Sequence, residues 1–213
     1  MNIVPAIDEQ TGQDFEASVN KVKDFAQVVH VDFNDGSFGD YKTVGPQDIE
    51  KYILAQKARI NFEAHLMVQQ PYDYIPKLIE SGFRKIIIQF EIDLNLRDLL
   101  EELLIDNVLA GVAIGPETAI ADAEPIFDLV DTITIMTVYP GRQGQAFLPE
   151  PLEKVKRLRA DNFQQEVEVD GGITSDNIRL VADLGVDTAI VGHYIMNDED
   201  PGGKYEALVR FGN

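Results

Sequence analysis

Eight short runs of β-branched and apolar residues recur along the chain, and they constrain its fold more than any other feature of the sequence. They read NIVPAI, VVHVDF, INFEAHLMV, KIIIQF, VLAGVAI, TITIMTV, EVEVD and TAIVG. Each run has the length of a β-strand and is rich in residues that favour strands. The sequence therefore predicts eight strands, spread over nearly the whole chain.

Segments with the apolar spacing of amphipathic helices lie between these runs. The expected helices cover Asp14–Phe25, Gln47–Ala55, Asp73–Ser81, Leu96–Leu104, Glu150–Arg159, Ser175–Leu184 and Lys204–Phe211. The stretch after VAIGPET has the least regular helical pattern, and NDEDPGGK is expected to form a polar loop before the last helix. The LEELL run at 100–104 is interpreted as an ordinary half-buried helix face.

Alternation of strands with helices predicts the fold class. Such strands pair in parallel through right-handed crossovers, and eight units in 213 residues close most naturally into a barrel. We therefore expect one α/β domain over residues 1–213, a (β/α)₈ TIM barrel with a parallel eight-stranded core. A doubly wound open sheet is the alternative.

The charge balance narrows the classes of partner. The chain carries 18 basic and 37 acidic residues, a formal net charge of −19. That charge repels nucleic-acid backbones and anionic lipid surfaces, so neither is expected as a partner. The sequence has no long apolar run, and MNIVPAIDEQ lacks the pattern of a secretion signal, so we expect a cytoplasmic protein. The acidity fits either a need for solubility or a high-salt habitat.

Histidines and carboxylates at strand ends are the candidate metal ligands. The chain contains no cysteine, so a metal would need imidazole and carboxylate ligands. His30 and Asp32 share one face near the end of one strand, His65 follows on the next, and Asp170 ends a later one. Functional side chains of a barrel collect at these ends. Taken singly, each is more often a hydrogen-bonded structural residue, but together they suit a divalent cation.

Glycine-rich turns follow three of the late strands and are candidates for binding an anion. They lie at Gly141 to Gly144, at Gly171 and Gly172, and at Gly192. Glycine lets backbone N–H groups approach an anion closely, and the last two strand ends of a barrel often bind phosphate. His193, directly after the last of these glycines, is expected to be a loop residue near the site and not a further metal ligand.

Four separated motifs resemble, in order and spacing, segments of the ribulose-phosphate 3-epimerase family. They are VHVDFNDGSF, EAHLMVQQPYDYI, IMTVYPGRQGQAFLP and EVDGGI, and the resemblance runs from IVPAI to IVGHYIM. It implies that His30, Asp32, His65 and Asp170 bind a divalent metal. Zinc is the first expectation, and iron(II), cobalt(II) and manganese(II) are alternatives. Relatives with this fold often associate through their outer helices, so a homo-oligomer is one option.

The resemblance also implies an activity on a small-molecule sugar phosphate. Asp32 and Asp170 would be the catalytic acid and base, inverting C3 of a ketose phosphate through an enediolate while the metal polarises the C2 carbonyl. The first expected reaction converts D-ribulose 5-phosphate to D-xylulose 5-phosphate, in pentose phosphate metabolism. By the same resemblance Met67 and Met136 surround the enediolate, although ordinary core packing is an equal alternative for these two methionines. Gly171, Gly172 and Gly192 would cradle the phosphate, and Gly141, Arg142 and Gly144 would belong to a loop over the substrate.

Five positions depart from the family pattern, and all are expected near the substrate. Ala6 replaces a serine, Asn34 a methionine, Tyr139 an asparagine, Arg142 an aromatic residue and His193 a serine. One interpretation is a changed sugar, such as D-allulose 6-phosphate, or an altered phosphate site in which Arg142 or His193 supplies positive charge to the anion in place of a lost hydroxyl. The other is a paralogue that keeps the metal without catalysis.

Overall fold

The strands close into a barrel, which confirms the predicted fold class. The structure, a computed structural model, describes residues 1–56 and 58–212. Eight parallel strands follow one another around the barrel in chain order, and β1 pairs with β8, which excludes the open sheet. The strands are β1 (Asn2–Ile7), β2 (Val28–Asn34), β3 (Asn61–Met67), β4 (Lys85–Gln89), β5 (Leu109–Ile114), β6 (Thr132–Met136), β7 (Glu166–Asp170) and β8 (Thr188–Val191).

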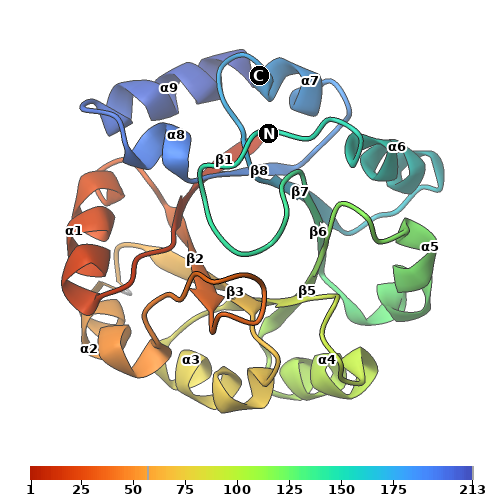
Figure 1. The fold of residues 1–213 in the computed structure, drawn as a ribbon, viewed down its shortest axis with the longest axis horizontal. Coiled ribbons are helices and arrows are strands. Elements are labelled where there is room, and N and C mark those ends of the chain that lie inside the picture. Colours follow the sequence, from red (N-terminus) through yellow and green to blue (C-terminus); the bar gives the residue numbers. More distant parts are fainter. Residues whose placement is uncertain (57, 213) are drawn as a thin grey trace.

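Helices surround the barrel in a ring, as the view along its axis shows (Figure 1). The α-helices are α1 (Gly12–Val22), α2 (Pro46–Gln56), α3 (Ile75–Ser81), α4 (Leu96–Ile105), α5 (Ile120–Ala123), α6 (Leu152–Ala160), α7 (Ile178–Ala182), α8 (His193–Met196) and α9 (Pro201–Phe211). Two 3₁₀ helices, η1 (Pro71–Asp73) and η2 (Glu124–Leu129), complete the set in the described residues. None of these helices is long and apolar enough to cross a bilayer.

Several helices differ from their expected bounds. Helix α1 ends at Val22 instead of Phe25, and α7 is shorter at both ends than the expected Ser175–Leu184. After β5 the weakly patterned stretch forms only the short α5 and then η2, because Pro125 interrupts the α-helical hydrogen bonding. Helix α9 begins at Pro201, three residues before the expected start, since Asp200 caps it by accepting a hydrogen bond from Gly203 N–H. His193 begins α8 and is not in a loop, so that expectation was wrong.

Apolar side chains lie mainly outside the barrel, between the sheet and the helices. Alternate residues of each strand point to opposite faces, and those facing outward, such as Val31, Leu66 and Ile88, are buried against the helices in one large cluster. Inside the barrel the apolar cluster is small and consists of Ile87, Ala113, Met136 and Val138. The other inward positions carry many polar and charged groups.

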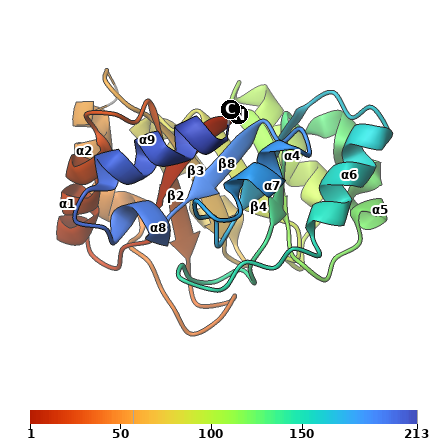
Figure 2. The ribbon, with the colours of Figure 1, turned by 90° about the horizontal axis from the view of Figure 1, so that it is seen from above.

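Two long loops extend from the same end of the barrel. One follows β2 and the other follows β6, and in Figure 2 both project below the barrel, on the side away from the N-terminus. In Figure 1 the loop after β6 crosses the mouth of the barrel. This end holds the carboxyl ends of the strands, where the candidate ligands were expected. We call residues 139–147 of the second loop the lid.

Candidate metal centre and substrate pocket

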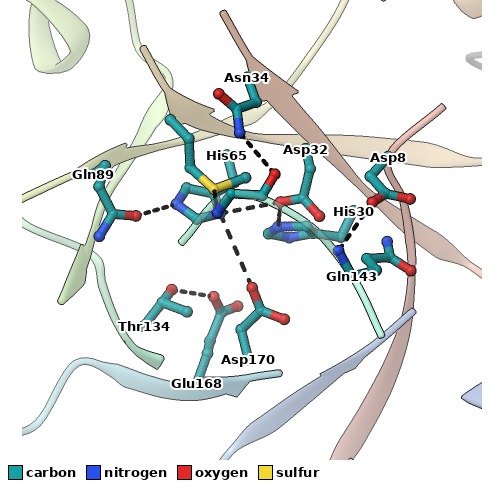
Figure 3. Close-up of polar contacts among 12 residues, drawn as sticks. Asp8, His30, Asp32, Asn34, His65, Gln89, Thr134, Gln143, Glu168 and Asp170 are labelled. Carbon is teal, nitrogen blue, oxygen red and sulfur yellow. Dashed lines mark hydrogen bonds and ion pairs between the residues drawn. The ribbon is translucent and has the colours of Figure 1, made fainter. Parts of the chain in front are cut away.

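The four candidate ligands converge inside the mouth of the barrel (Figure 3). His30 and Asp32 come from β2, His65 from β3 and Asp170 from β7, and one ligand atom of each lies within 4.8 Å of those of the others. Strand register produces this arrangement, because Asp32 pairs with His65 across β2 and β3. The histidines are fully buried, whereas Asp32 and Asp170 are 6% and 9% exposed.

One ring nitrogen of each histidine and one carboxylate oxygen of each aspartate face the same space. His65 Nδ1 lies 3.1 Å from Asp32 Oδ1 and 4.0 Å from Asp170 Oδ2, and His30 Nε2 lies 3.4 Å from Asp32 Oδ1. His30 Nε2 is buried and has no hydrogen-bond partner among the described residues. A buried polar atom without a partner is costly, and a cation in this space would supply one. Two imidazoles and two carboxylates therefore fit a divalent transition metal.

A glutamate fixes the orientation of the first imidazole. His30 Nδ1 lies 2.8 Å from Glu63 Oε1. An ionised carboxylate only accepts hydrogen bonds, so Nδ1 carries the proton and donates it to Glu63. With Nδ1 engaged in this way, Nε2 is the ring nitrogen that faces the ligand space, and its lone pair would bind a cation that takes the place of any proton there.

A glutamine fixes the second imidazole in the opposite tautomer. Gln89 Nε2 donates to Glu91 Oε2 at 2.5 Å, so the amide oxygen must face His65. His65 Nε2 lies 2.8 Å from that oxygen and therefore carries the proton. Nδ1 of His65 is left to face Asp32 and Asp170, and in a metal-bound site its lone pair would point at the ion. The two histidines thus present different ring nitrogens to the same space.

The two aspartates differ in acidity although they are close together. Burial disfavours the charge on Asp32, but hydrogen bonds from His30 and His65 outweigh it and hold its pKa below the usual range. Burial, together with the charge of Asp32, raises the pKa of Asp170 to about 6. Burial also opposes charge on His30, but Asp32 and Glu63 raise its pKa well above the usual value. Without a metal, Asp170 is therefore the one of the two aspartates that more readily holds a proton near neutral pH.

A cavity of about 340 Å³ opens onto the two aspartates. Most of the residues expected to contact substrate line it: Ala6, Met67, Met136, Gly141, Arg142, Gly144, Gly171, Gly172, Gly192 and His193, along with Tyr139. No ion pair or hydrogen bond within the described part of the chain engages the side chain of Arg142. His193 Nδ1 lies 2.8 Å from Asn197 Nδ2, one turn along the chain.

Asn34 does not line this cavity and instead ties the lid down. Its amide donates to the carbonyl of Gly141 at 2.7 Å, and Gly141 N–H contacts Met67 Sδ at 3.2 Å. Gly141 has φ +139°, and a Cβ there would collide with the carbonyl of Phe38. Glycine is therefore required where the lid passes the loop after β2.

Two further pocket residues, Asp8 and Gln143, escaped the sequence reasoning. Asp8 Oδ2 accepts a hydrogen bond from Gln143 N–H at 3.1 Å, and burial followed by the charge of Asp32 raises the pKa of Asp8 to about 6. The amide of Gln143 packs so closely on Gly192 that a Cβ there would collide with it, and Gln143 Nε2 is buried with no partner among the described residues. Asp8 and Gln143 are 135 residues apart in the sequence, so no local motif contains both of them.

Glu63 and Gln89 were also missed, although a signal for each was present. Glu63 lies two residues before His65, on the same face of β3, and Gln89 ends β4 next to that strand. Alternation along the strands would have placed both side chains inside a closed barrel. Their partners become evident only with the register between neighbouring strands.

Comparison with known proteins gives one consistent family. A sequence model described as the ribulose-phosphate 3-epimerase family matches residues 2–196. The ribulose-phosphate 3-epimerase of Chlamydia muridarum is 30% identical over 200 residues, which cover 91% of this chain and 87% of that protein. The protein of that name from Bacillus subtilis is 30% identical over 196 residues, covering 88% and 89%.

Solved structures agree in fold at lower sequence identity. The 3-hexulose-6-phosphate synthase of Salmonella typhimurium superposes with a TM-score of 0.77 at 18% identity, covering 99% of this chain and 98% of that one. A 3-keto-L-gulonate-6-phosphate decarboxylase from Vibrio cholerae gives a TM-score of 0.71 at 16% identity, with the same coverage. At these identities the likeness concerns the barrel alone.

Proposed function

The chain belongs to the ribulose-phosphate 3-epimerase family of carbohydrate epimerases, and on that basis we propose that it is a metal-dependent isomerase that inverts C3 of a ketose phosphate. The first candidate reaction interconverts D-ribulose 5-phosphate and D-xylulose 5-phosphate. The observation that carries this proposal is the convergence of Asp32 and Asp170 with two oriented imidazoles at the floor of one cavity.

The four converging residues would hold the metal. A divalent cation, zinc first and iron(II), cobalt(II) or manganese(II) as alternatives, would polarise the C2 carbonyl of the sugar and acidify the proton on C3. His30 and His65 contribute by presenting lone pairs whose direction is fixed by Glu63 and Gln89.

The two carboxylates would move the proton. Asp32 and Asp170 come from separate strands and both reach the cavity, so each can face a different side of the sugar carbon. One takes the proton from C3 as a base, and the other returns a proton to the opposite side as an acid, which inverts the carbon without oxidation or reduction. In the reverse direction the roles exchange. A pKa of about 6 for Asp170 suits a group that must both hold and release a proton.

The rim of the cavity would bind the phosphate. Backbone N–H groups at Gly171, Gly172 and Gly192 are the candidate cradle, as the sequence suggested. The guanidinium of Arg142, which has no ion-pair partner among residues 1–56 and 58–212, and His193 at the start of α8 supply nearby groups able to contact an anion. The lid, held by Asn34 and Asp8, covers the cavity and would limit access of water.

Substitutions around the cavity make a second ketose a real alternative. Asp8, Gln143 and His193 give the rim polar groups, and Ala6 offers no hydroxyl. More polar groups suit a sugar with more hydroxyls, so D-allulose 6-phosphate belongs beside D-ribulose 5-phosphate in any assay. A metal-binding protein without catalysis is the third reading.

Solvent deuterium exchange tests the proposal directly. The chain is stripped with a chelator, restored with zinc, and incubated in D₂O with D-ribulose 5-phosphate or D-allulose 6-phosphate, and deuterium at C3 is followed by NMR. We expect metal-dependent exchange with the pentulose, and its loss in Asp32→Asn but not in Asp183→Asn, an exposed change of the same kind. Exchange only with the hexulose would reassign the substrate, and no exchange with either would overturn catalysis.

A further inference from the structure

A second charged layer lies in the barrel directly beneath the candidate ligands. Lys85 Nζ, from β4, lies 2.9 Å from Glu63 Oε2, 2.5 Å from Glu168 Oε1 and 3.2 Å from Glu166 Oε2. The Glu63 and Glu168 side chains are 4% and 0% exposed, and that of Lys85 is 11% exposed. Burying these charges is expensive, and the proposed chemistry uses none of them directly.

We propose that Glu63, held in place by Lys85, is a positioning residue that sets the affinity of the metal centre through His30. The inference rests on the metal centre of the proposed function and adds to it the residues that orient one of its ligands.

The two oxygens of Glu63 have separate partners. Oε1 accepts the Nδ1 proton of His30 at 2.8 Å, and Oε2 accepts a hydrogen bond from Lys85 Nζ at 2.9 Å. A carboxylate held at both oxygens cannot rotate, so the imidazole it contacts is held as well. A negative acceptor also draws the Nδ1 proton and makes Nε2 a stronger ligand.

Lys85 keeps Glu63 available for this task. Without the ammonium group, the carboxylates of Glu63, Glu166 and Glu168 would repel one another in the interior, and Glu63 would have to move or take up a proton. Burial opposes the charge on Lys85, but the three glutamates outweigh it and raise its pKa further above the usual range. The lysine therefore stays charged at neutral pH.

The other ligand histidine provides an internal contrast. His65 is oriented by the neutral amide of Gln89, whereas His30 is oriented by a carboxylate. Glu63→Gln would give His30 the neutral kind of acceptor that His65 already has. An amide also has one oxygen for two donors, so either His30 or Lys85 would lose its partner.

Zinc affinity of the metal-free chain tests the proposal. Competition with a chromogenic chelator gives the Kd for Zn²⁺ alone, without substrate. We expect Glu63→Gln to weaken zinc binding by about 10- to 100-fold, the range found when a residue supporting a metal ligand is removed. Glu166→Gln is the matched control, because Glu166 contacts Lys85 but is not hydrogen-bonded to a histidine. Its Kd should remain within about threefold of the unmodified value, since the Glu166 side chain is 32% exposed and its contacts are with Lys85, Thr132 and Thr188 rather than with a metal ligand.

Cobalt gives a readout that a general loss of stability would not change. The visible absorption of bound Co²⁺ reports ligand geometry, so it should change in Glu63→Gln and remain unaltered in Glu166→Gln. Lys85→Met should weaken zinc binding as Glu63→Gln does, and the double variant should be no weaker than the worse single variant, because both act through one contact. If Lys85→Met does not fold, Glu63→Gln still decides the matter.

Three results would overturn the inference: an unchanged Kd and cobalt spectrum in Glu63→Gln, an equal loss in Glu166→Gln, or no zinc binding by the unmodified chain. The proposed function fails separately, if the chain binds zinc in this manner but exchanges no sugar proton.

Discussion

Two layers of charged side chains fill the barrel, and they meet the same electrostatic problem in different ways. In the lower layer the carboxylates of Glu63, Glu166 and Glu168 surround Lys85, so the polypeptide supplies their cation. In the upper layer Asp32 and Asp170 face two histidines and have no lysine or arginine as an ion-pair partner within the described residues. Buried carboxylates need a countercharge, and in the upper layer only histidine protons can supply it, which a bound cation would replace.

The carboxyl groups of the lower layer differ in pKa, as the two aspartates of the upper layer do. Burial and the charge of Glu63 raise the pKa of Glu168 to about 7, while Lys85 lowers it in part. Burial disfavours the charge on Glu63, but His30 and Lys85 prevail and lower its pKa to about 2. The lower layer thus reduces its negative charge with a lysine and, near neutral pH, with a proton on Glu168. This comparison shows that buried carboxylates inside a barrel do not by themselves indicate a metal site. The informative feature is that, among the described residues, no lysine or arginine is paired with the carboxylates of the upper layer.

The largest expected effect comes from removing a carboxylate of the upper layer. Asp170→Asn should reduce kcat/KM for the preferred ketose phosphate by about 10³- to 10⁴-fold, because the variant loses an acid–base group and a ligand. Steady-state kinetics at saturating zinc measure this. Circular dichroism should show an unchanged barrel. Near-normal turnover would mean that the upper layer is a structural cluster like the lower one.

Removal of Lys85, the cation of the lower layer, should instead destabilise the folded chain. Lys85→Met should lower the free energy of unfolding by about 3–5 kcal/mol, since it leaves buried carboxylates without their partner. Denaturant titration provides the value. Lys77→Met, at a partly exposed lysine paired with Glu50 and Glu80, should change it far less, because ion pairs open to solvent contribute little. Equal effects of the two substitutions would erase the distinction between the lower layer and a surface ion pair.

Zinc should stabilise the chain through the upper layer alone. At a free concentration 100 times Kd it should add about 2.7 kcal/mol to the free energy of unfolding, because it binds the folded state preferentially. Thermal melts with zinc and with chelator measure the shift. The shift should disappear in a His65→Ala variant. A shift that survives that change would place the ion elsewhere.

The smallest effect concerns Asp8, a carboxylate at the rim that belongs to neither layer. Its folded-state pKa of about 6 exceeds the ordinary 3.8, so the folded state holds the proton more tightly. The associated stability is present below about pH 4 and is lost as pH rises through about 6. Asp8→Asn mimics the protonated form, so in chelator it should gain about 1–2 kcal/mol at pH 8, after allowance for partial exposure. Denaturation at both pH values would show no gain at pH 4, and an equal gain at both would refute this origin.

Sequence patterns sufficed for the barrel and for the residues of the upper layer. Eight strand-like runs fixed the order of elements, and polar residues at strand ends indicated which groups should meet, as the structure brings them together. The lower layer was missed, because the charges in KIIIQF and EVEVD also fit strands with one exposed face. Only closure of the barrel turns Lys85 and Glu168 inward.

The rim was the least predictable region. Asn34 was expected beside the substrate, yet its amide holds the lid. The contact between Asp8 and Gln143 joins the end of β1 to a loop far along the chain, and no periodic pattern encodes such a contact. Loop conformation depends on a few specific hydrogen bonds, which one sequence does not reveal.

The spacing of the two layers has a consequence for the history of such a chain. Glu63 and His65 are two residues apart on β3, as are Glu168 and Asp170 on β7. Insertion or deletion of one residue in either strand would rotate both members of a pair toward the helices at once. Descendants of this protein can therefore alter the loops at the mouth, in length as well as in composition, while these strands tolerate only replacements in place. New sugar preferences would therefore arise from changes in the loops around the cavity, while the charged residues on the strands stay in place.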